Sequence, residues 1–165
     1  MIIFGAGNAV GVILGGVLGH VLYKKSPSFP PLVMGSTIIL SCVPMWFMIN
    51  SVSSTTRIAV TTIVGFSLGV LTIISVPIER AIIVNVTLPE TRGRANAFLG
   101  VIDDIGKGFG PFFLSQLITA FGRRLAFNVS LIGWLIGGSI SFFLYCTVKR
   151  DEDKIQDAIR ARIQM

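Results

Sequence analysis

The segment Val101-Ile-Asp-Asp-Ile-Gly-Lys-Gly-Phe-Gly-Pro111 determines how many times the chain is predicted to cross a membrane. Its two carboxylates and one ammonium group separate two apolar stretches, residues 95–102 and 108–122. Each stretch alone is shorter than the roughly 20 residues that a membrane-spanning helix needs, and only together do they reach that length. The segment is therefore predicted to lie inside a span.

The composition of the rest of the chain is that of a membrane protein. Of its 165 residues, 52% are hydrophobic and 13% are charged, whereas a soluble domain carries about 25% charged residues. Four further stretches have no charge and are long enough to cross a hydrocarbon core of about 30 Å: residues 1–23, 26–56, 58–78 and 125–148. They lack the period-two alternation of barrel strands, so the predicted fold is an all-α, polytopic helical bundle with five transmembrane helices.

Charge sets the predicted topology. The spans are expected at about residues 2–23, 31–50, 58–79, 95–121 and 125–148, followed by a cytoplasmic amphipathic tail at 149–165. Ten Lys and Arg residues fall on one side and three on the other. The first group is Lys24, Lys25, Arg80, Arg92, Arg94, Lys149, Arg150, Lys154, Arg160 and Arg162; the second is Arg57, Arg123 and Arg124. By the positive-inside rule the C-terminus is cytoplasmic, and the N-terminus is outside or lumenal.

Several function classes are disfavoured by composition. The net charge of +6 comes from basic residues at span ends and does not form one soluble basic face, so no nucleic-acid partner is expected. One histidine and two cysteines within apolar spans form no metal-ligand or catalytic pattern. We therefore expect no metal, no cofactor and no enzymatic activity. In the tail, Ile155, Ile159 and Ile163 form an apolar stripe, which predicts a short helix near the membrane.

The first span carries four glycines at four-residue spacing, Gly7, Gly11, Gly15 and Gly19. Residues at this spacing share a helix face, and small side chains let another helix backbone approach closely. Two interpretations stay open: a tightly packed pair of helices, or a surface on which two helical bundles slide.

The end of this span, Gly16-Val-Leu-Gly-His20-Val-Leu-Tyr-Lys24-Lys25, resembles the cytoplasmic loop signature of the major facilitator superfamily. Gly16, Leu18, Gly19, Lys24 and Lys25 match the signature, whereas His20, Val21 and Tyr23 depart from it. In that family an acid at the position of His20 pairs with a neighbouring helix and holds one conformation. His20 is then either a structural hydrogen-bonding group or a pH-dependent substitute for that acid.

A second resemblance covers Leu88-Pro-Glu-Thr-Arg-Gly-Arg-Ala95, the glycines that lead to Pro111, and Phe121-Gly-Arg-Arg-Leu-Ala-Phe127. Its loop residues are Glu90, Arg92, Gly93 and Arg94. Pro89 and Glu90 suit the first turn of the helix that follows, and the arginines suit lipid headgroups. Together the motifs resemble helices eight to twelve of a twelve-helix facilitator, with a pattern similar to the spinster-like branch. The resemblance implies a C-terminal fragment whose partner is the missing N-terminal bundle; a misbounded gene model and a complete five-span protein remain alternatives.

The charged segment supplies the candidate site. Lys107 follows Asp103 by four residues and Asp104 by three, so one lysine can reach either acid and one negative charge remains. A helix rises about 13 Å from Arg94 to Asp103, which places the acids in the cytoplasmic part of the span. Charges at this depth are expected to face the bundle interior or a watery cavity. Three roles stay open for this position: a structural or gating ion pair, proton coupling, and direct contact with substrate.

Next to these charges, Gly106, Gly108, Gly110 and Pro111 are predicted to let the helix bend or pack closely. Pro44 and Pro77 mark similar weak points, and Glu79 with Arg80 is expected to form a local pair at the inner interface.

The predicted function is secondary transport of a small solute by alternating access, with the lipid bilayer and the solute as partners. The alternative is a non-transporting membrane module that assembles with or regulates a complete carrier through its glycine-lined first helix.

Overall fold

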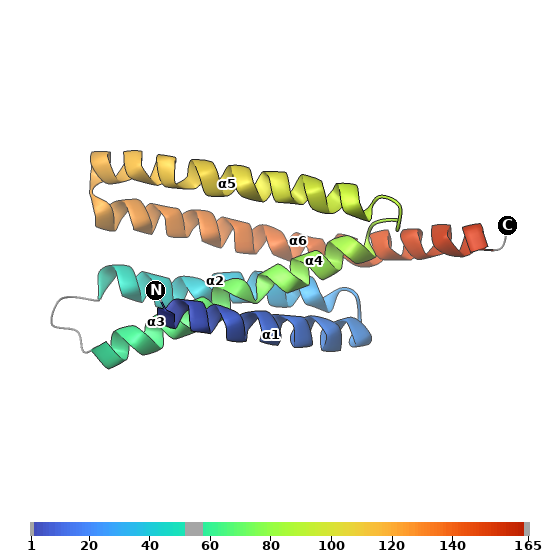
Figure 1. Cartoon of the computed structure of the whole chain (residues 1–165), viewed down its shortest axis with the longest axis horizontal. Coiled ribbons are helices and arrows are strands. Elements are labelled where there is room, and N and C mark those ends of the chain that lie inside the picture. Colours follow the sequence, from blue (N-terminus) through green and yellow to red (C-terminus); the bar gives the residue numbers. More distant parts are fainter. Residues whose placement is uncertain (1, 52–57, 164–165) are drawn as a thin grey trace.

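A computed structural model of the chain describes residues 2–51 and 58–163, and every regular element in these two ranges is an α-helix (Figure 1). The six helices are α1 (Ile2–Lys25), α2 (Phe29–Asn50), α3 (Ile58–Ile73), α4 (Ser75–Asn85), α5 (Arg92–Phe121) and α6 (Arg123–Ile163). Arg57 lies outside the described residues, and so do the side chains of Arg162 and Ile163.

Length and composition fit an integral, multi-pass membrane protein. α1, α2, the α3–α4 segment and α6 are each long and apolar enough to cross a membrane. α5 has 30 residues and so is about 45 Å long. It is long enough to cross a membrane, but with its charged segment it is not among the helices that are also apolar enough. The all-helical architecture is confirmed, and the fifth crossing through α5 stays a prediction.

The third predicted span, 58–79, differs from the structure because it is two helices that continue to Asn85. α3 ends at Ile73, and Ile74 lies between the two helices. Pro77 explains the break: it has no N–H to donate to the carbonyl of Ile73, four residues earlier. The second helix extends beyond the predicted end because Arg80 and the residues after it are compatible with a helix although they are less apolar.

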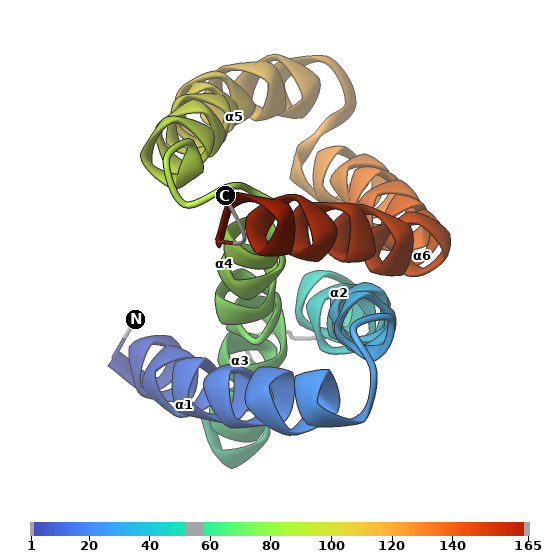
Figure 2. The same ribbon diagram turned by 90° about the vertical axis from the view of Figure 1, so that its right-hand side faces the viewer.

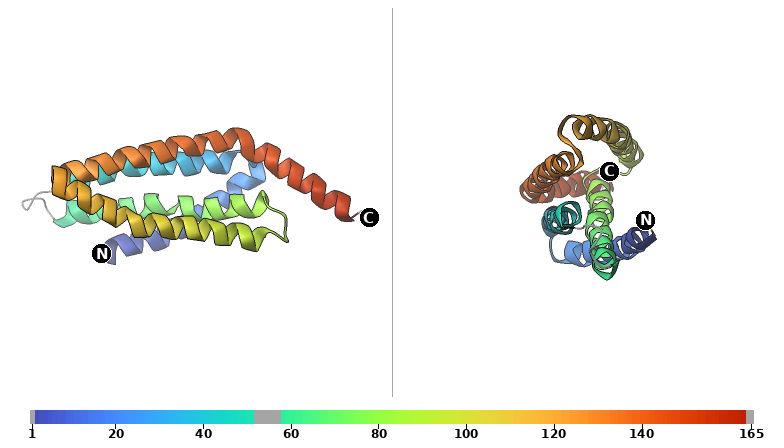
Figure 3. Two further views of the ribbon diagram at one scale, coloured as in Figure 1. Left: turned by 90° about the horizontal axis from the view of Figure 1, so that it is seen from above. Right: turned by 90° about the vertical axis from the view of Figure 1, so that its left-hand side faces the viewer.

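The tail also differs from the prediction. It is the uninterrupted continuation of the last span within α6, a helix of 41 residues and about 60 Å. No glycine or proline occurs between Gly138 and the end of α6, so nothing in the sequence ends the helix where the apolar stretch ends. The last turns of α6 extend past the other helices (Figure 3).

Successive helices run back and forth, so that connections 26–28 and 86–91 and the end of α6 lie at one end of the bundle (Figure 1). Gly122, which joins α5 to α6 with a φ of 81°, lies at the other end. A positive φ favours glycine, because glycine has no Cβ to clash with the backbone. Seen along the bundle, α2 and α4 lie between α1 and the α5–α6 pair (Figure 2).

The buried core lies where α2, α4 and α6 meet. It consists of Met34, Ile74, Ile78, Ile82 and Val148. The accessible surface of the chain is 10,697 Å², compared with about 8,000 Å² for a compact soluble monomer of this mass. Large apolar side chains, including Trp46 and Trp134, are exposed on this surface, as expected for helices that face lipid or further helices.

Candidate functional site

The charged segment lies on one continuous helix. Within α5, the Nζ of Lys107 donates a hydrogen bond to the Oδ2 of Asp103 at 2.5 Å. Asp104 is adjacent, and within residues 2–51 and 58–163 it makes no hydrogen bond or ion pair. The lysine therefore compensates one acid directly and leaves the second without a close partner.

These charges were expected to face the bundle interior or a watery cavity, and within this chain they do not face the interior. The exposed fraction is 69% for the Lys107 side chain and 49% for that of Asp103, and Asp104 is exposed as well. α5 has no buried residue, because only α6 and α4 pack beside it. Every residue from 101 to 113 is exposed. The charged face is thus an outer face of the described bundle.

α4 brings two further charges to the site. A cavity of about 170 Å³ lies between α4 and α5, and Glu79, Arg80 and Asp103 line it. The sequence predicted Glu79 and Arg80 only as a local pair. Among the described residues, no ion pair within 4.0 Å joins Arg80 to either acid. The spacing on α4 alone could not indicate this site, because it depends on where α4 crosses α5.

We call Glu79, Arg80, Asp103, Asp104 and Lys107 the charged cluster. Three acids and two bases give it a net charge of −1 when all five are ionised. A carboxylate at membrane depth is costly unless water, a cation or a proton reaches it. Asp104 also lines an apolar groove along α5 of about 590 Å³, together with Val101, Ile105, Gly108, Phe109 and Phe112. The residual charge therefore lies beside an open groove.

The glycines predicted to let α5 bend or pack closely contact no other helix in the described part of the chain. A Cβ built on Gly106, Gly108 or Gly110 would meet nothing within 4 Å. Pro111 lies inside α5, which continues through it. These small residues thus form part of the uncovered face of α5.

The four glycines at four-residue spacing are the only buried residues of α1, and they lie against the α3–α4 segment. A Cβ on Gly7 would collide with the carbonyl oxygen of Phe66. One on Gly11 would lie 2.5 Å from that of Val70, and one on Gly15 2.5 Å from that of Ile74. Gly19 is looser, with Ile78 at 3.5 Å. The glycine face is therefore occupied within this chain.

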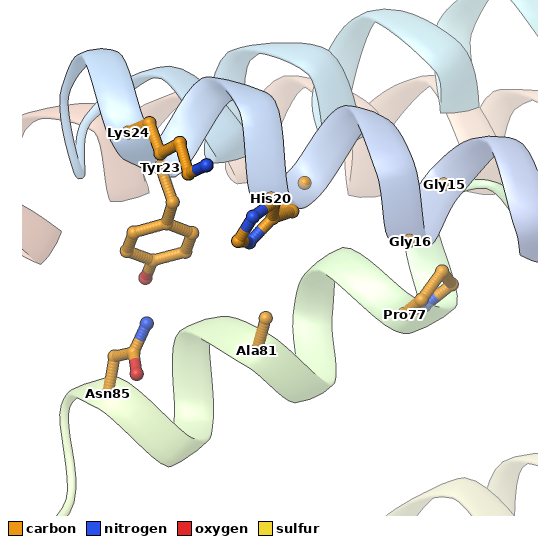
Figure 4. Close-up of a pocket in the computed structure, with 9 residues that line it drawn as sticks. Gly15, Gly16, His20, Tyr23, Lys24, Pro77, Ala81 and Asn85 are labelled. Carbon is orange, nitrogen blue, oxygen red and sulfur yellow. The ribbon is translucent and has the colours of Figure 1, made fainter.

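The loop-signature residues His20 and Lys24 lie beside a second cavity, of about 490 Å³, between α1 and α4 (Figure 4). Gly16 also lines it, and Tyr23 and Asn85 point toward each other across it (Figure 4). Lys25 ends α1 in the exposed last turn. The sequence did not predict Asn85 at this position, because the contact joins helices that are far apart along the chain.

The tail begins at this end of the bundle (Figure 1). Glu152 is half-buried on α6, and its Oε2 atom has no hydrogen-bond partner among the described residues. Burial raises the pKa of the Glu152 carboxyl above its usual range, and the negative charge of Asp153 raises it further.

The connection between α4 and α5 contains the second motif. Arg92 Nε donates a hydrogen bond to the carbonyl oxygen of Val84 at 3.0 Å, so Arg92 ties the end of α4 to the start of α5. A Cβ on Gly93 would meet nothing within 4 Å, and Arg94 is exposed. Pro89 and Glu90 precede α5 and do not lie in its first turn, because the N–H groups of Thr91 and Arg92 bond the carbonyl of Leu88.

Comparison of this chain with models of protein families, with curated proteins and with solved structures finds no match. The site is therefore interpreted from its own geometry.

Proposed function

We propose that the chain is part of a secondary transporter of small solutes of the major facilitator type, and that its helices form most of one of two bundles that move against each other. The second bundle would be supplied by further spans of the same protein. The charged cluster would then lie on or near the path between the bundles, where water or the facing bundle can compensate its net charge.

The observation that carries this proposal is the outward placement of Asp103, Asp104 and Lys107 on a helix of membrane length. Lipid is a poor environment for such a face, so a watery path or a complementary protein surface is required. A gate fits the geometry because the Asp103–Lys107 pair is local to one helix and Asp104 remains available for a partner that forms in only one conformation. Proton binding at Asp104 would serve the same purpose.

The test is transport by the complete protein in proteoliposomes. Vesicles are incubated with a mixture of sugars, amino acids, organic anions and lysolipids under a proton gradient, and their contents are compared by mass spectrometry with those of protein-free vesicles. We expect at least one solute to accumulate in a protein-dependent way. The proposal is contradicted if protein-dependent uptake is absent under a proton gradient of either sign and under a sodium gradient.

The alternative, a regulatory module that docks through the glycine face of α1, has less support because α3 and α4 cover that face. A module of this kind would have to dock through α5. Co-purification with a complete carrier, together with no uptake by this protein alone, would favour it.

A further inference from the structure

The end of the bundle that contains Gly122 has positive charge without any acid. The ends of α2 and α5 and the starts of α3 and α6 lie at this end (Figure 1). The whole sequence has no Asp or Glu in residues 1–78 or 105–150. The nearest acid along α5 is Asp104, and 17 residues of helix, about 26 Å, separate it from Phe121. Accordingly, no Asp or Glu within residues 2–51 and 58–163 forms an ion pair with Arg123 or Arg124.

The two arginines line a cavity of about 450 Å³ whose other lining residues are Met48, Ile49 and Phe127. This volume is within the range of small-molecule sites. The lining thus combines two arginines with three apolar residues. Arg123 makes no hydrogen bond or ion pair within the described ranges, so all of its N–H donors are available.

Arg124 is held in position at this cavity. One of its terminal nitrogens donates a hydrogen bond to the backbone carbonyl of Asn50 at 2.8 Å. The side chain of Asn50 is paired with that of Asn128 and also donates to the carbonyl of Trp46 at 3.0 Å. The guanidinium is therefore oriented before a ligand arrives, which lowers the cost of binding.

We propose that this cavity binds a phosphate group, carried by an anionic phospholipid headgroup or by a free phosphate ester. Guanidinium groups donate paired, charge-assisted hydrogen bonds to the oxygens of a phosphate, and both arginines line this one cavity. The apolar lining residues Met48, Ile49 and Phe127 suit the first carbons of an acyl chain, so the lipid is the expected source. This inference does not depend on the proposed transport function.

The test uses the protein purified in a phosphate-free non-ionic detergent. Dihexanoyl phosphatidylglycerol and inorganic phosphate are titrated separately, and the Kd is measured by thermophoresis. We expect Arg123→Gln to weaken binding of the preferred probe at least about tenfold, and Arg123→Lys to weaken it less. Arg150→Gln is the matched control, because it removes an exposed arginine without a hydrogen bond from the far part of the same helix. It should leave the Kd within about twofold.

Two outcomes identify the source of the phosphate. Tighter, Arg123-dependent binding of the lipid assigns the site to a headgroup, and equal Arg123-dependent binding of inorganic phosphate assigns it to a free ester. Equal affinities of Arg123→Gln and Arg150→Gln for both probes would overturn the proposal. Arg124→Gln removes the hydrogen bond to the Asn50 carbonyl and could prevent folding. Arg123 makes no hydrogen bond among the described residues, so the comparison of Arg123→Gln with Arg150→Gln does not depend on that variant.

Discussion

Gly7 of α1 and Gly69 of α3 face each other at the point where the two helices cross. The Cα of each lies 3.3 Å from the position that a Cβ would take on the other. A Cβ on Gly69 would also lie 2.5 Å from the carbonyl oxygen of Phe4. The nearest neighbours of both Cβ positions are backbone atoms, which cannot move aside as the end of a side chain can. Neither position therefore has room for a Cβ.

Gly69→Ala is therefore expected to destabilise the bundle by about 1–3 kcal/mol, because the helices must separate to admit one methyl group. Gly65→Ala is the matched control on the same helix, since nothing lies within 4 Å of its Cβ position. It should be neutral or stabilise the helix by up to about 1 kcal/mol. Reversible unfolding in detergent would measure both, and equal stabilities would contradict the close crossing.

Asn50 and Asn128 exchange hydrogen bonds between α2 and α6 at 3.0 and 3.2 Å. We expect a coupling energy of about 0.6–1.7 kcal/mol between the two side chains, the range found for such bonds inside membranes. A double-mutant cycle of Asn50→Ala, Asn128→Ala and the double variant would measure it in unfolding experiments. Strict additivity of the two single effects would show that the pair contributes nothing to stability.

In the complete protein, Asp103→Asn and Asp104→Asn are expected to alter uptake or its pH dependence more than Lys107→Arg. The asparagines remove a charge from the cluster, whereas arginine keeps the positive charge beside Asp103. Initial uptake rates across a range of pH, normalised to protein in the vesicles, provide the measurement. Wild-type rates and pH profile in both acid variants would remove these residues from the mechanism.

The raised pKa of Glu152 leads us to expect that the stability of the folded chain depends on pH. Its carboxyl has a raised pKa in the folded state, so folding favours its protonated form. Below the ordinary Glu value of about 4.3 the group is protonated in both states and costs nothing. As pH rises through that value and then through the folded pKa, the native state progressively loses stability.

Glu152→Gln should accordingly raise Tm relative to the wild type more at pH 7 than at pH 4. Asp157→Asn, a change of one exposed acid on the same helix, is the control and should show a smaller difference between the two pH values. A Glu152→Gln effect that does not change with pH would mean that the burial of this carboxyl has no energetic consequence.

The fifth crossing can be tested by cysteine labelling. Glu90 and Arg123, at the two ends of α5, are each replaced by cysteine after Cys42 and Cys146 have been changed to serine. An impermeant maleimide should label position 123 in sealed vesicles of one orientation and position 90 in those of the other, with position 90 on the cytoplasmic side. Labelling of both positions from the same side would show that α5 does not cross.

The helical class of the chain and the approximate limits of most helices followed from the sequence, because hydropathy and span length are local properties. The glycine spacing in residues 7–19 likewise predicted a close approach, since a helix face is defined by spacing alone. Pro77 lies within one turn of the break at Ile74, but Pro44 and Pro111 lie inside helices that continue through them, so a proline alone did not predict where a helix would end.

Tertiary structure decided which elements meet. It placed α3 on the glycine face, Glu79 and Arg80 beside Asp103, and the charged side of α5 outward. Each of these relationships joins residues far apart in the chain and depends on the angles and rotations at which helices pack. A periodic pattern identifies a face of a helix, but the packing of the whole bundle determines what that face meets.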